Sequence, residues 1–340
     1  MRFILFIICL VYINAEFIFQ VQKSFETSLK AKALFQVVPT EKNMFAKMTP
    51  NQVKSHLGFT PAPPDKMAIE NGDKILKAMK AINPNPSDRV LSECSCSCNC
   101  SCPNDPLPIR QEQQNKDTNY NIKDQFPNCI GPVRDQGNCG SCWAHSAVNT
   151  FSTSLCIQKK QKAFLQLSIQ DLVSCDKYDN GCNGGSLENP FKYYMTQKGI
   201  TTDSCLPYVS GPGNVPKCPT QCKDKNEKMT RYKCLAKSTV DLGEDIEKKK
   251  TWLRNQGPLD VGFDVYEDFL YYQSGIYQHS QGKSIGGHAV TLVGYGSLSG
   301  VNYWILKNSW SSNWGEGGYF RIKMGECNLD KYGAVSCLPE

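Results

Sequence analysis

One cysteine in this chain is placed where a thiol can act as a nucleophile. Cys142 follows Gly140-Ser141 and opens an apolar pattern that predicts a helix to about Gln158. The dipole at a helix N-terminus favours an anion, so we expect the pKa of this thiol to fall. A thiolate is the nucleophile of covalent catalysis. The alternative is a disulfide partner, the commoner role for a cysteine in this chain.

A thiolate nucleophile needs a base, and the chain has four histidines. His288 follows two glycines and precedes an apolar run that predicts a buried strand, at the distance downstream expected for such a base. His279 is the second candidate, but no strand pattern follows it. His145 lies three residues after Cys142, where we expect it to pack, and His56 lies in the N-terminal block.

Two amides complete a possible catalytic set. Asn308 can hold one imidazole nitrogen and turn the other toward sulfur, although an asparagine here is also typical of a turn. We expect Trp310 to shield that hydrogen bond from water. Gln136 stands six residues before Cys142, and its amide can donate to an oxyanion together with the backbone N–H of Cys142.

The start of the chain predicts an export signal. Met1-Arg2 precedes an apolar run from residue 3 to residue 13, and Ala15 offers a small residue at a cleavage point. A membrane anchor is the alternative, but a spanning helix needs about 20 apolar residues. No later stretch is long and apolar enough to span a membrane, and the 18 cysteines favour an oxidising compartment.

Length and charge exclude several classes of protein. With 340 residues and 40% hydrophobic residues the chain is long and apolar enough for a core, so it is not wholly disordered, collagen-like or a coiled coil. The net charge is +6, of which +4 lies up to Lys116 and +2 beyond it. No basic run is interleaved with aromatic residues, so nucleic-acid binding is not expected.

The N-terminal block up to about Lys116 carries short helical patterns and no catalytic motif. Residues 17–57 predict two amphipathic helices, the second beginning at Thr49-Pro50. A third helix is predicted from Gly72 to Ile82, before Pro84. We expect all three helices to pack rather than to do chemistry.

A cysteine-rich tract separates this block from the rest. Residues 94–102 alternate five cysteines with small polar residues. They are either a soft-metal site or an exposed linker, and the spacing lacks the two-residue gaps typical of zinc ligands. Asn99-Cys100-Ser101 is a glycosylation sequon. We expect the stretch from Pro103 onward to be a site of proteolysis.

Four strings of the second part resemble a known family. They are Gln136-Gly-Asn-Cys-Gly-Ser-Cys-Trp-Ala, Cys182-Asn-Gly-Gly185, Gly287-His288-Ala-Val and Asn308-Ser-Trp-Ser-Ser-Asn-Trp314-Gly315. From about Asn121 to Pro339 the chain resembles the papain-like cysteine peptidases. Phe126-Pro-Asn-Cys129 and Tyr271-Tyr-Gln-Ser-Gly-Ile-Tyr-Gln-His279 make it most similar to their cathepsin B-like members.

The resemblance implies a fold and a domain organisation. The fold is α+β, with a helical left lobe, a β-barrel-like right lobe and the active-site cleft between them. A signal peptide would cover residues 1–15, a mostly helical propeptide with its Cys-Ser linker residues 16–116, and the peptidase domain residues 117–340. The mature start would fall between Pro103 and Gln125.

The resemblance also implies roles for particular residues. Cys142 would be the nucleophile, His288 the base, Asn308 the orienting group and Gln136 the oxyanion donor. The contacts with substrate would come from Trp310, Tyr332 and the backbone of Gly184 and Gly185. Of these, Tyr332 stands where cathepsin B has an acid, which favours an apolar second subsite.

Two departures from cathepsin B bear on activity. The loop between Cys205 and Cys222 is short and lacks the paired histidines that give cathepsin B its dipeptidyl-carboxypeptidase action. We therefore expect an endopeptidase with a weak or missing exopeptidase mode. The family usually has Phe where this chain has His145, which can fill the same space or perturb the thiolate.

The family pattern implies a disulfide set. The expected pairs are Cys139–Cys182, Cys129–Cys156, Cys175–Cys218 and Cys205–Cys222. Of the three remaining cysteines we expect Cys234 to pair with Cys337, leaving Cys327 free. Each bridge stabilises the fold by about 2–4 kcal/mol.

Two functions of different classes follow. The first is a thiol endopeptidase made as a zymogen, acting on protein or peptide substrates and held latent by its own propeptide. The second is a non-catalytic secreted binding protein on the same scaffold. For the first we expect a monomer, no metal or cofactor, and a place in the secretory pathway, in a lysosome, digestive vacuole or the extracellular space.

Overall fold

The computed structural model describes residues 23, 25–27, 34–62, 65–82 and 118–340. The predicted signal peptide, the Cys-Ser tract, its sequon and most of the predicted cleavage stretch lie outside these residues. The first helix predicted within residues 17–57 also lies largely outside them. No helix among the described residues is long and apolar enough to cross a bilayer.

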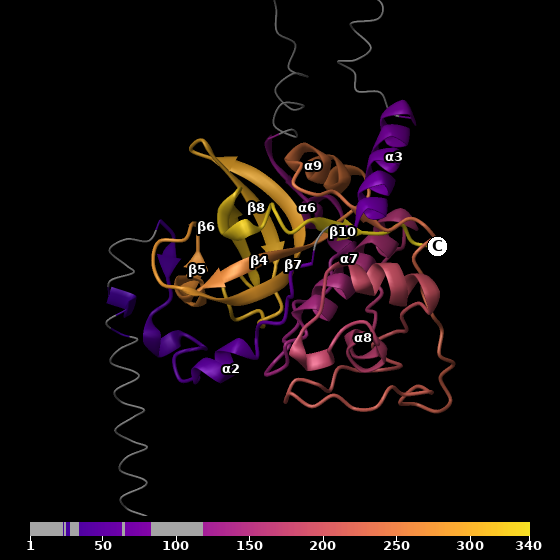
Figure 1. The fold of residues 1–340 in the computed structure, drawn as a ribbon, viewed down its shortest axis with the longest axis horizontal. Coiled ribbons are helices and arrows are strands. Elements are labelled where there is room, and N and C mark those ends of the chain that lie inside the picture. The colour runs from indigo at the N-terminus through magenta and orange to yellow at the C-terminus, as the bar shows by residue number, and fades with distance from the viewer. Residues whose placement is uncertain (1–22, 24, 28–33, 63–64, 83–117) are drawn as a thin grey trace, which may run out of the picture.

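Helices form one lobe of the molecule and line the edges of the other (Figure 1). The α-helices are α2 (Pro50–Lys54), α3 (Lys66–Ile82), α6 (Ile122–Gln125), α7 (Cys142–Gln158), α8 (Ile169–Cys175) and α9 (Ile246–Asn255). The shorter turns are the 3-10 helices η1 (Thr40–Lys42), η2 (Pro127–Cys129), η3 (Gly181–Asn183), η5 (Glu267–Tyr271) and η6 (Glu326–Asn328), and the π-helix η4 (Pro190–Met195).

An eight-stranded sheet forms the second lobe. Its order is β3-β10-β4-β7-β8-β9-β6, with β2 paired to β7. The strands of this sheet are β2 (Tyr120–Asn121), β3 (Val240–Asp241), β4 (Leu259–Tyr266), β6 (Ile276–Tyr277), β7 (Ser284–Leu298), β8 (Val301–Lys307), β9 (Tyr319–Lys323) and β10 (Ala334–Ser336). A separate two-stranded sheet consists of β1 (Gln36–Val37) and β5 (Tyr272–Ser274). The long strand β7 contains the two glycines and the apolar run after His288, and from His288 to Gly296 it is buried, as the sequence predicts.

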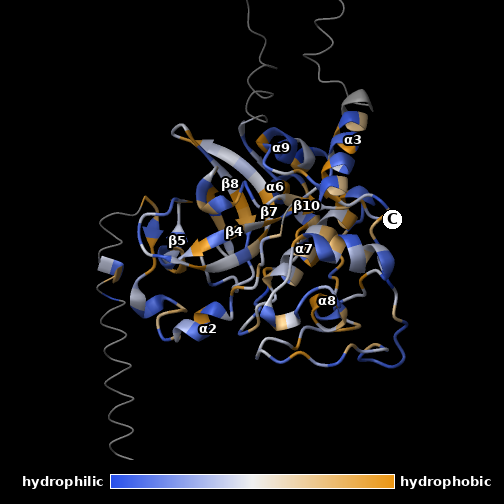
Figure 2. Cartoon of the chain, in the orientation of Figure 1, coloured by the Kyte–Doolittle hydropathy of each residue, from blue (hydrophilic) through white to orange (hydrophobic). Residues whose placement is uncertain are grey.

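The helix α7 joins the two lobes. It begins at Cys142 and ends at Gln158, as the apolar pattern predicts, and it packs against β7. Nearly all its side chains are buried, since one face meets the helical lobe and the other meets the sheet. In Figure 2 the hydrophobic residues, drawn in orange, are accordingly found on α7 and on the strands β4 and β7 that it faces. Burial on both faces holds the first residue of α7 rigidly between the lobes.

All five predicted disulfides are present. The structure has Cys129–Cys156, Cys139–Cys182, Cys175–Cys218, Cys205–Cys222 and Cys234–Cys337. Among the described residues Cys142 and Cys327 are the free cysteines, as expected. The prediction that Cys142 is not a disulfide partner is therefore confirmed.

The N-terminal block lies against both lobes. Its strand β1 pairs antiparallel with β5, and Phe35 and Phe45 enter the core of the sheet lobe. The helix α2 begins at Pro50 with Thr49 as its N-cap, as predicted, and Gln52 completes a capping box. The third predicted helix is α3, which begins six residues earlier than predicted, at Lys66.

Candidate active site

The structure brings Cys142 and His288 together between the lobes. Cys142 is the first residue of α7, and its sulfur lies beside the backbone N–H of Ala289, the residue after His288. His288 is on β7, where it pairs with Phe263 of β4. Both side chains are fully buried. The nucleophile and the base thus come from different lobes, as the family resemblance implies.

Asn308 orients the imidazole of His288. Asn308 follows β8, and its Oδ1 lies 2.7 Å from His288 Nε2. The backbone N–H of Ser309 also donates to this oxygen at 2.8 Å, which supports its assignment as the acceptor. The proton therefore sits on Nε2, and Nδ1 keeps its lone pair. Among the described residues Nδ1 has no hydrogen-bond partner, so it is the nitrogen left for the thiol.

Trp310 covers the histidine–asparagine pair. Its ring stacks on His288 with the centroids 4.5 Å apart, and Trp314 packs edge-on against it at 5.1 Å. Removing water from this hydrogen bond strengthens it, because the local dielectric falls. The shielding role predicted for Trp310 is consistent with this geometry, and its Nε1 also donates to the carbonyl of His56 at 3.3 Å.

The side-chain amide of Gln136 donates to two backbone carbonyl oxygens, one of which belongs to the N-terminal block. Its Oε1 accepts from Ser309 Oγ at 2.6 Å, which fixes the orientation of the amide. Its Nε2 then donates to His56 O at 3.0 Å and to Cys139 O at 2.9 Å. A donor fixed in this way is suited to hold an oxyanion.

Residues 56–60 of the N-terminal block, which we name the cleft segment, run between the two lobes across this site. On the helical side Gly185 N donates to Gly58 O at 2.8 Å, and Thr60 N donates to Gly185 O at 2.9 Å. On the sheet side Phe59 N donates to Gly287 O at 3.2 Å. The pairing of Phe59 with Gly185 is parallel. The backbone at Gly185, where we expect a substrate to bind, is therefore paired with the cleft segment in this structure.

Glycines permit this close approach. A Cβ on Gly58 would lie 1.9 Å from the carbonyl oxygen of Gly140. Gly184 has φ +108°, and a Cβ there would lie 2.8 Å from Gly58 O. The cleft segment crosses the site only because Gly58 lacks a side chain.

Phe59 packs against Tyr332, the residue expected at the second subsite, which is a contact that the sequence did not predict. Its ring lies edge-on to Tyr332 with the centroids 5.4 Å apart, and it occupies the space that a Cβ on Gly262 would need. The hydroxyl of Tyr332 donates to Asp264 Oδ1 at 3.0 Å, and Asn328 Nδ2 donates to Asp264 Oδ2 at 2.7 Å. The signal for this contact in the sequence was Phe59, a large apolar residue directly after Gly58.

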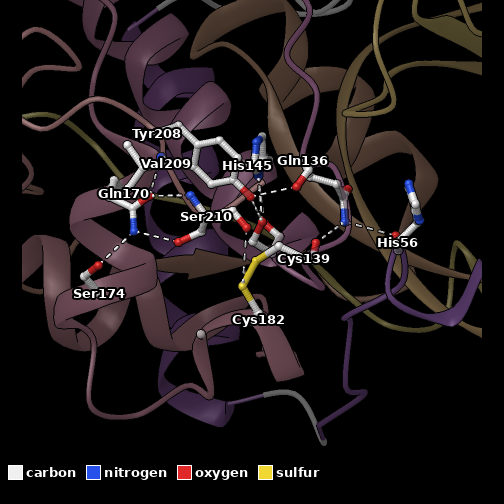
Figure 3. Close-up of a disulfide and its surroundings, with 12 residues drawn as sticks. His56, Gln136, Cys139, His145, Gln170, Ser174, Cys182, Tyr208, Val209 and Ser210 are labelled. Atoms are coloured by element: carbon white, nitrogen blue, oxygen red, sulfur yellow. Dashed lines mark hydrogen bonds between the residues drawn. A yellow bond between two sulfur atoms is a disulfide. The ribbon is translucent and has the colours of Figure 1, made fainter. Parts of the chain in front are cut away.

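His145 lies beside the ring of Tyr208, close to the residues around the disulfide Cys139–Cys182 (Figure 3). Its Nδ1 donates to Ser141 O at 3.0 Å, and Tyr208 packs edge-on against its ring. Burial lowers the pKa of His145 to about 3, so the ring is neutral. This agrees with the packing role expected from the sequence.

The other two histidines have different partners. His279 Nδ1 donates to the buried Asp268 at 3.1 Å, and its ring stacks on Tyr266. His279 is therefore held away from the thiol. His56 lies inside the cleft segment, with its ring buried against Phe45 and its Nδ1 donating to Gln52 O. Its carbonyl, rather than its ring, faces Gln136.

The expected low pKa of Cys142 is absent in this covered state. Burial raises the pKa of the Cys142 thiol to about 12, despite backbone N–H groups that lower it. Burial also lowers the pKa of His288 to about 3, although the hydrogen bond that its Nε2 donates to Asn308 raises it. Both groups are therefore neutral between about pH 4 and pH 11. The prediction was wrong for this state because covering the site removes the water that would solvate a thiolate.

One group of possible metal ligands occurs among the described residues. The ligand atoms of Cys205, Cys222 and Glu227 lie within 4.8 Å of one another. The two sulfur atoms are joined in a disulfide, so neither offers a thiolate.

A pair of acids beneath Gly185 makes the stability depend on pH. Burial and the neighbouring Asp176 raise the pKa of Asp179 to about 7. Its Oδ1 accepts from Ser186 N at 2.9 Å and from Asn189 Nδ2 at 3.1 Å, while the charge of Lys198 acts on Asp176. An unfolded Asp titrates near 4, so the folded chain keeps a proton that the unfolded chain releases between about pH 4 and pH 7.

We expect Asp179→Asn to flatten this dependence. The contribution of Asp179 to the free energy of unfolding is highest below about pH 4 and falls by about 1–3 kcal/mol as the pH rises from about 4 through 7. The amide carries no ionisable proton, so the fall should shrink by about that amount. Urea unfolding at pH 4.5 and 7.5 measures it. The exposed Asp224→Asn is the control, and an unchanged fall in Asp179→Asn would contradict the assignment.

Comparison with known proteins agrees with this geometry. Residues 117–336 match the family described as papain family cysteine protease, and the chain belongs to that family. It is a cysteine-type peptidase of the cathepsin B-like kind. It is 46% identical to "Cathepsin B-like CP2" of Giardia intestinalis over 216 residues, covering 62% of this chain and 71% of the relative. It is 36% identical to "Cathepsin B" of Dictyostelium discoideum over 228 residues, with the same coverage.

The solved structures it resembles include proforms. "ProCathepsin B S9 from Trypanosoma congolense" matches with a TM-score of 0.74 and 25% identity, covering 94% of this chain and 98% of that one. A digestive procathepsin L2 from Tenebrio molitor matches with a TM-score of 0.66 at 24% identity, covering 96% of this chain and 91% of that one, and shows the fold. The papain-like fold and the zymogen form expected from the sequence are thus confirmed.

Proposed function

We propose that this chain is the zymogen of a cysteine endopeptidase whose nucleophile is Cys142. The observation that carries the proposal is the hydrogen bond of 2.7 Å between His288 Nε2 and Asn308 Oδ1, which leaves Nδ1 as the imidazole nitrogen without a hydrogen-bond partner among the described residues. This is the arrangement in which a base is oriented by a third group.

The reaction follows from the positions of these groups once the cleft is open. His288 Nδ1 takes the proton of Cys142, and the thiolate attacks the carbonyl carbon of the scissile bond. Gln136 Nε2 and the backbone N–H of Cys142 hold the oxyanion. The imidazolium then protonates the leaving amine, and an acyl-enzyme remains. Water attacks the acyl carbon and gives its proton to His288, which releases the acid and restores the thiol.

The direction of the cleft segment accounts for latency. It is parallel to Gly185, whereas we expect a substrate to lie in the opposite direction. The carbonyl of His56 occupies the donors of Gln136 and Trp310, so no scissile carbonyl can use them. The segment thus imitates a substrate without presenting a peptide bond correctly. We assign residues 1–15 to a signal peptide, 16–116 to the propeptide and 117–340 to the peptidase domain.

The substrate class follows from the pocket that Phe59 fills. Gly262 leaves room for a ring, and Tyr332 closes the pocket with its hydroxyl bound to Asp264. The second residue on the amino side of the cleaved bond should therefore be aromatic or large and aliphatic. Because Asp264 already accepts from Tyr332 and Asn328, it offers little to an incoming arginine.

The loop beside Gln136 supports endopeptidase action. Between Cys205 and Cys222 it packs on Gln170 and bonds to Asn138 through the carbonyl of Gly211. It carries no histidine that could bind the C-terminal carboxylate of a substrate. The five disulfides support a secretory-route protein, in a lysosome or digestive vacuole or outside the cell.

One set of peptides tests the proposal. The processed enzyme should cleave internally quenched peptides blocked at both ends, with a kcat/KM at least tenfold higher for Phe than for Arg at that second position. The same peptides with a free C-terminus should be cleaved no faster. A strong preference for the free end, or for Arg, would overturn the corresponding part. A folded, processed protein that cleaves none of them would favour the binding-protein alternative.

A further inference from the structure

We propose that α3 is a second anchor of the N-terminal block, which holds the cleft segment over Cys142 from a separate surface of the peptidase domain. The inference rests on the proposed latency. The surface consists of β3, α9 and the residues around η4, on the far side of α7 from the cleft segment (Figure 1). Its occupant is residues 65–82 of this chain.

The start of α3 is bound to the helical lobe. Asp65 N donates to Glu188 Oε1 at 2.8 Å, and the carboxylate of Asp65 pairs with Lys192. The same carboxylate accepts from the N–H of Met67 at 2.8 Å, so it caps the helix as well. The helix therefore begins at a position set by the peptidase domain.

The middle of α3 enters the core of the sheet lobe. Leu76 is 6% exposed and belongs to the same cluster of buried side chains as Val240 and Leu242. Gly72 lets the helix approach β3, since a Cβ there would lie 3.0 Å from Leu242 Cδ2 and 3.3 Å from the carbonyl of Asp241. Burying one leucine contributes about 1.5–3 kcal/mol.

Polar contacts surround this apolar centre. Asn71 Nδ2 donates to Thr239 O at 3.2 Å. Asp73 pairs with Lys248 of α9. The outer face is hydrophilic, as the blue residues of α3 in Figure 2 show. A helix with one buried stripe and specific partners on three sides is a docked element rather than a spacer.

The anchor acts on the cleft through chain length. Thr60 leaves the cleft only six residues before Lys66, where α3 begins. If α3 were released, the nearest described residue of the peptidase domain would be Thr118, 58 residues along the chain. The effective concentration of a tethered segment falls with about the 3/2 power of tether length, so the contribution of this C-terminal tether would drop by about 30-fold. A cleft segment that lifts off is thus held from both sides while α3 is bound, and only from the N-terminal side, through β1 and Phe45, once α3 is released.

Leu76→Asp in the full chain tests the proposal. The measured quantity is the rate at which an epoxide thiol-protease probe labels Cys142 in the uncleaved precursor, with the site mapped by mass spectrometry. We expect the rate to rise severalfold, and by no more than about 30-fold, because the N-terminal tether of the cleft segment stays in place. The control is Ala78→Asp, which places the same charge at an exposed position of the same helix and should change the rate by less than twofold.

A second variant guards against misfolding. Leu76→Ala leaves a cavity instead of a buried charge and should raise the rate in the same direction by a smaller factor. Rates of Leu76→Asp and Leu76→Ala that stay within twofold of the native rate, while amide exchange shows α3 released, would overturn the proposal.

Failure of the proposed function would give a different result. If Cys142 is not labelled even in the processed native protein, the assignment of the nucleophile fails. The role of α3 as an anchor is then tested by the rate of amide hydrogen exchange at Phe59 and Thr60, whose N–H groups donate to the carbonyls of Gly287 and Gly185. Their exchange should accelerate in Leu76→Asp and stay unchanged in Ala78→Asp. Equal exchange in both variants would overturn the anchor.

Discussion

Cys142→Ala should abolish peptide hydrolysis by the processed enzyme, with a fall in kcat of about 10⁵-fold or more. The alanine has no lone pair to attack the carbonyl carbon, and no other thiol can replace it. In the proposed mechanism His288 and Asn308 act as a unit with Cys142, so removing the sulfur should remove nearly all the contribution of the set. Steady-state hydrolysis of a blocked peptide measures the loss.

The control for this variant is the other free cysteine. Cys327 is buried in the sheet lobe, in η6, and takes no part in the hydrogen bond between His288 and Asn308. Cys327→Ala should keep kcat within about threefold of the native value. Turnover retained in Cys142→Ala, in a preparation free of native enzyme, would disprove the assignment of the nucleophile.

Gly58→Leu should open the uncleaved precursor. A Cβ at this position would lie 1.9 Å from Gly140 O, a contact between a side chain and a rigid backbone. The cleft segment must then lift, which breaks its bonds to Gly185. Water returns to Cys142, and the burial that raises its pKa to about 12 is lost. We expect the rate of labelling of Cys142 in the precursor to rise at least 100-fold.

Thr60→Leu is the matched control for Gly58→Leu. It adds a leucine to the same segment, but Thr60 is exposed and only its backbone N–H bonds to Gly185. Its labelling rate should remain within threefold of the native precursor. A Gly58→Leu precursor that is labelled as slowly as the native one would show that the cleft segment does not restrict the thiol.

Much of the candidate site could be predicted because it depends on local sequence. The helix that begins at Cys142 follows from its apolar spacing, and the strand after His288 follows from its glycines and apolar run. The N-cap at Thr49 follows from the Thr-Pro pair. In each case neighbouring residues supply the physical reason, so the pattern is visible in a single sequence.

The pKa of Cys142 shows where local reasoning ends. A helix N-terminus favours the thiolate, and for a site open to water that expectation remains a prediction. In the covered chain the cleft segment removes solvent from the thiol and from His288, and burial outweighs the helix. Because the covering residues lie more than 80 positions earlier, no spacing around Cys142 reports them.

The sequence by itself determined the nucleophile, base and orienting residues as candidates, the disulfide set through its family resemblance, and the existence of an N-terminal block. Only the tertiary structure decided that Phe59 packs against Tyr332, that the carbonyl of His56 accepts a hydrogen bond from the Gln136 amide, and that α3 docks on β3. These contacts join residues far apart in the chain. They depend on shape and on the removal of water, which no short motif encodes.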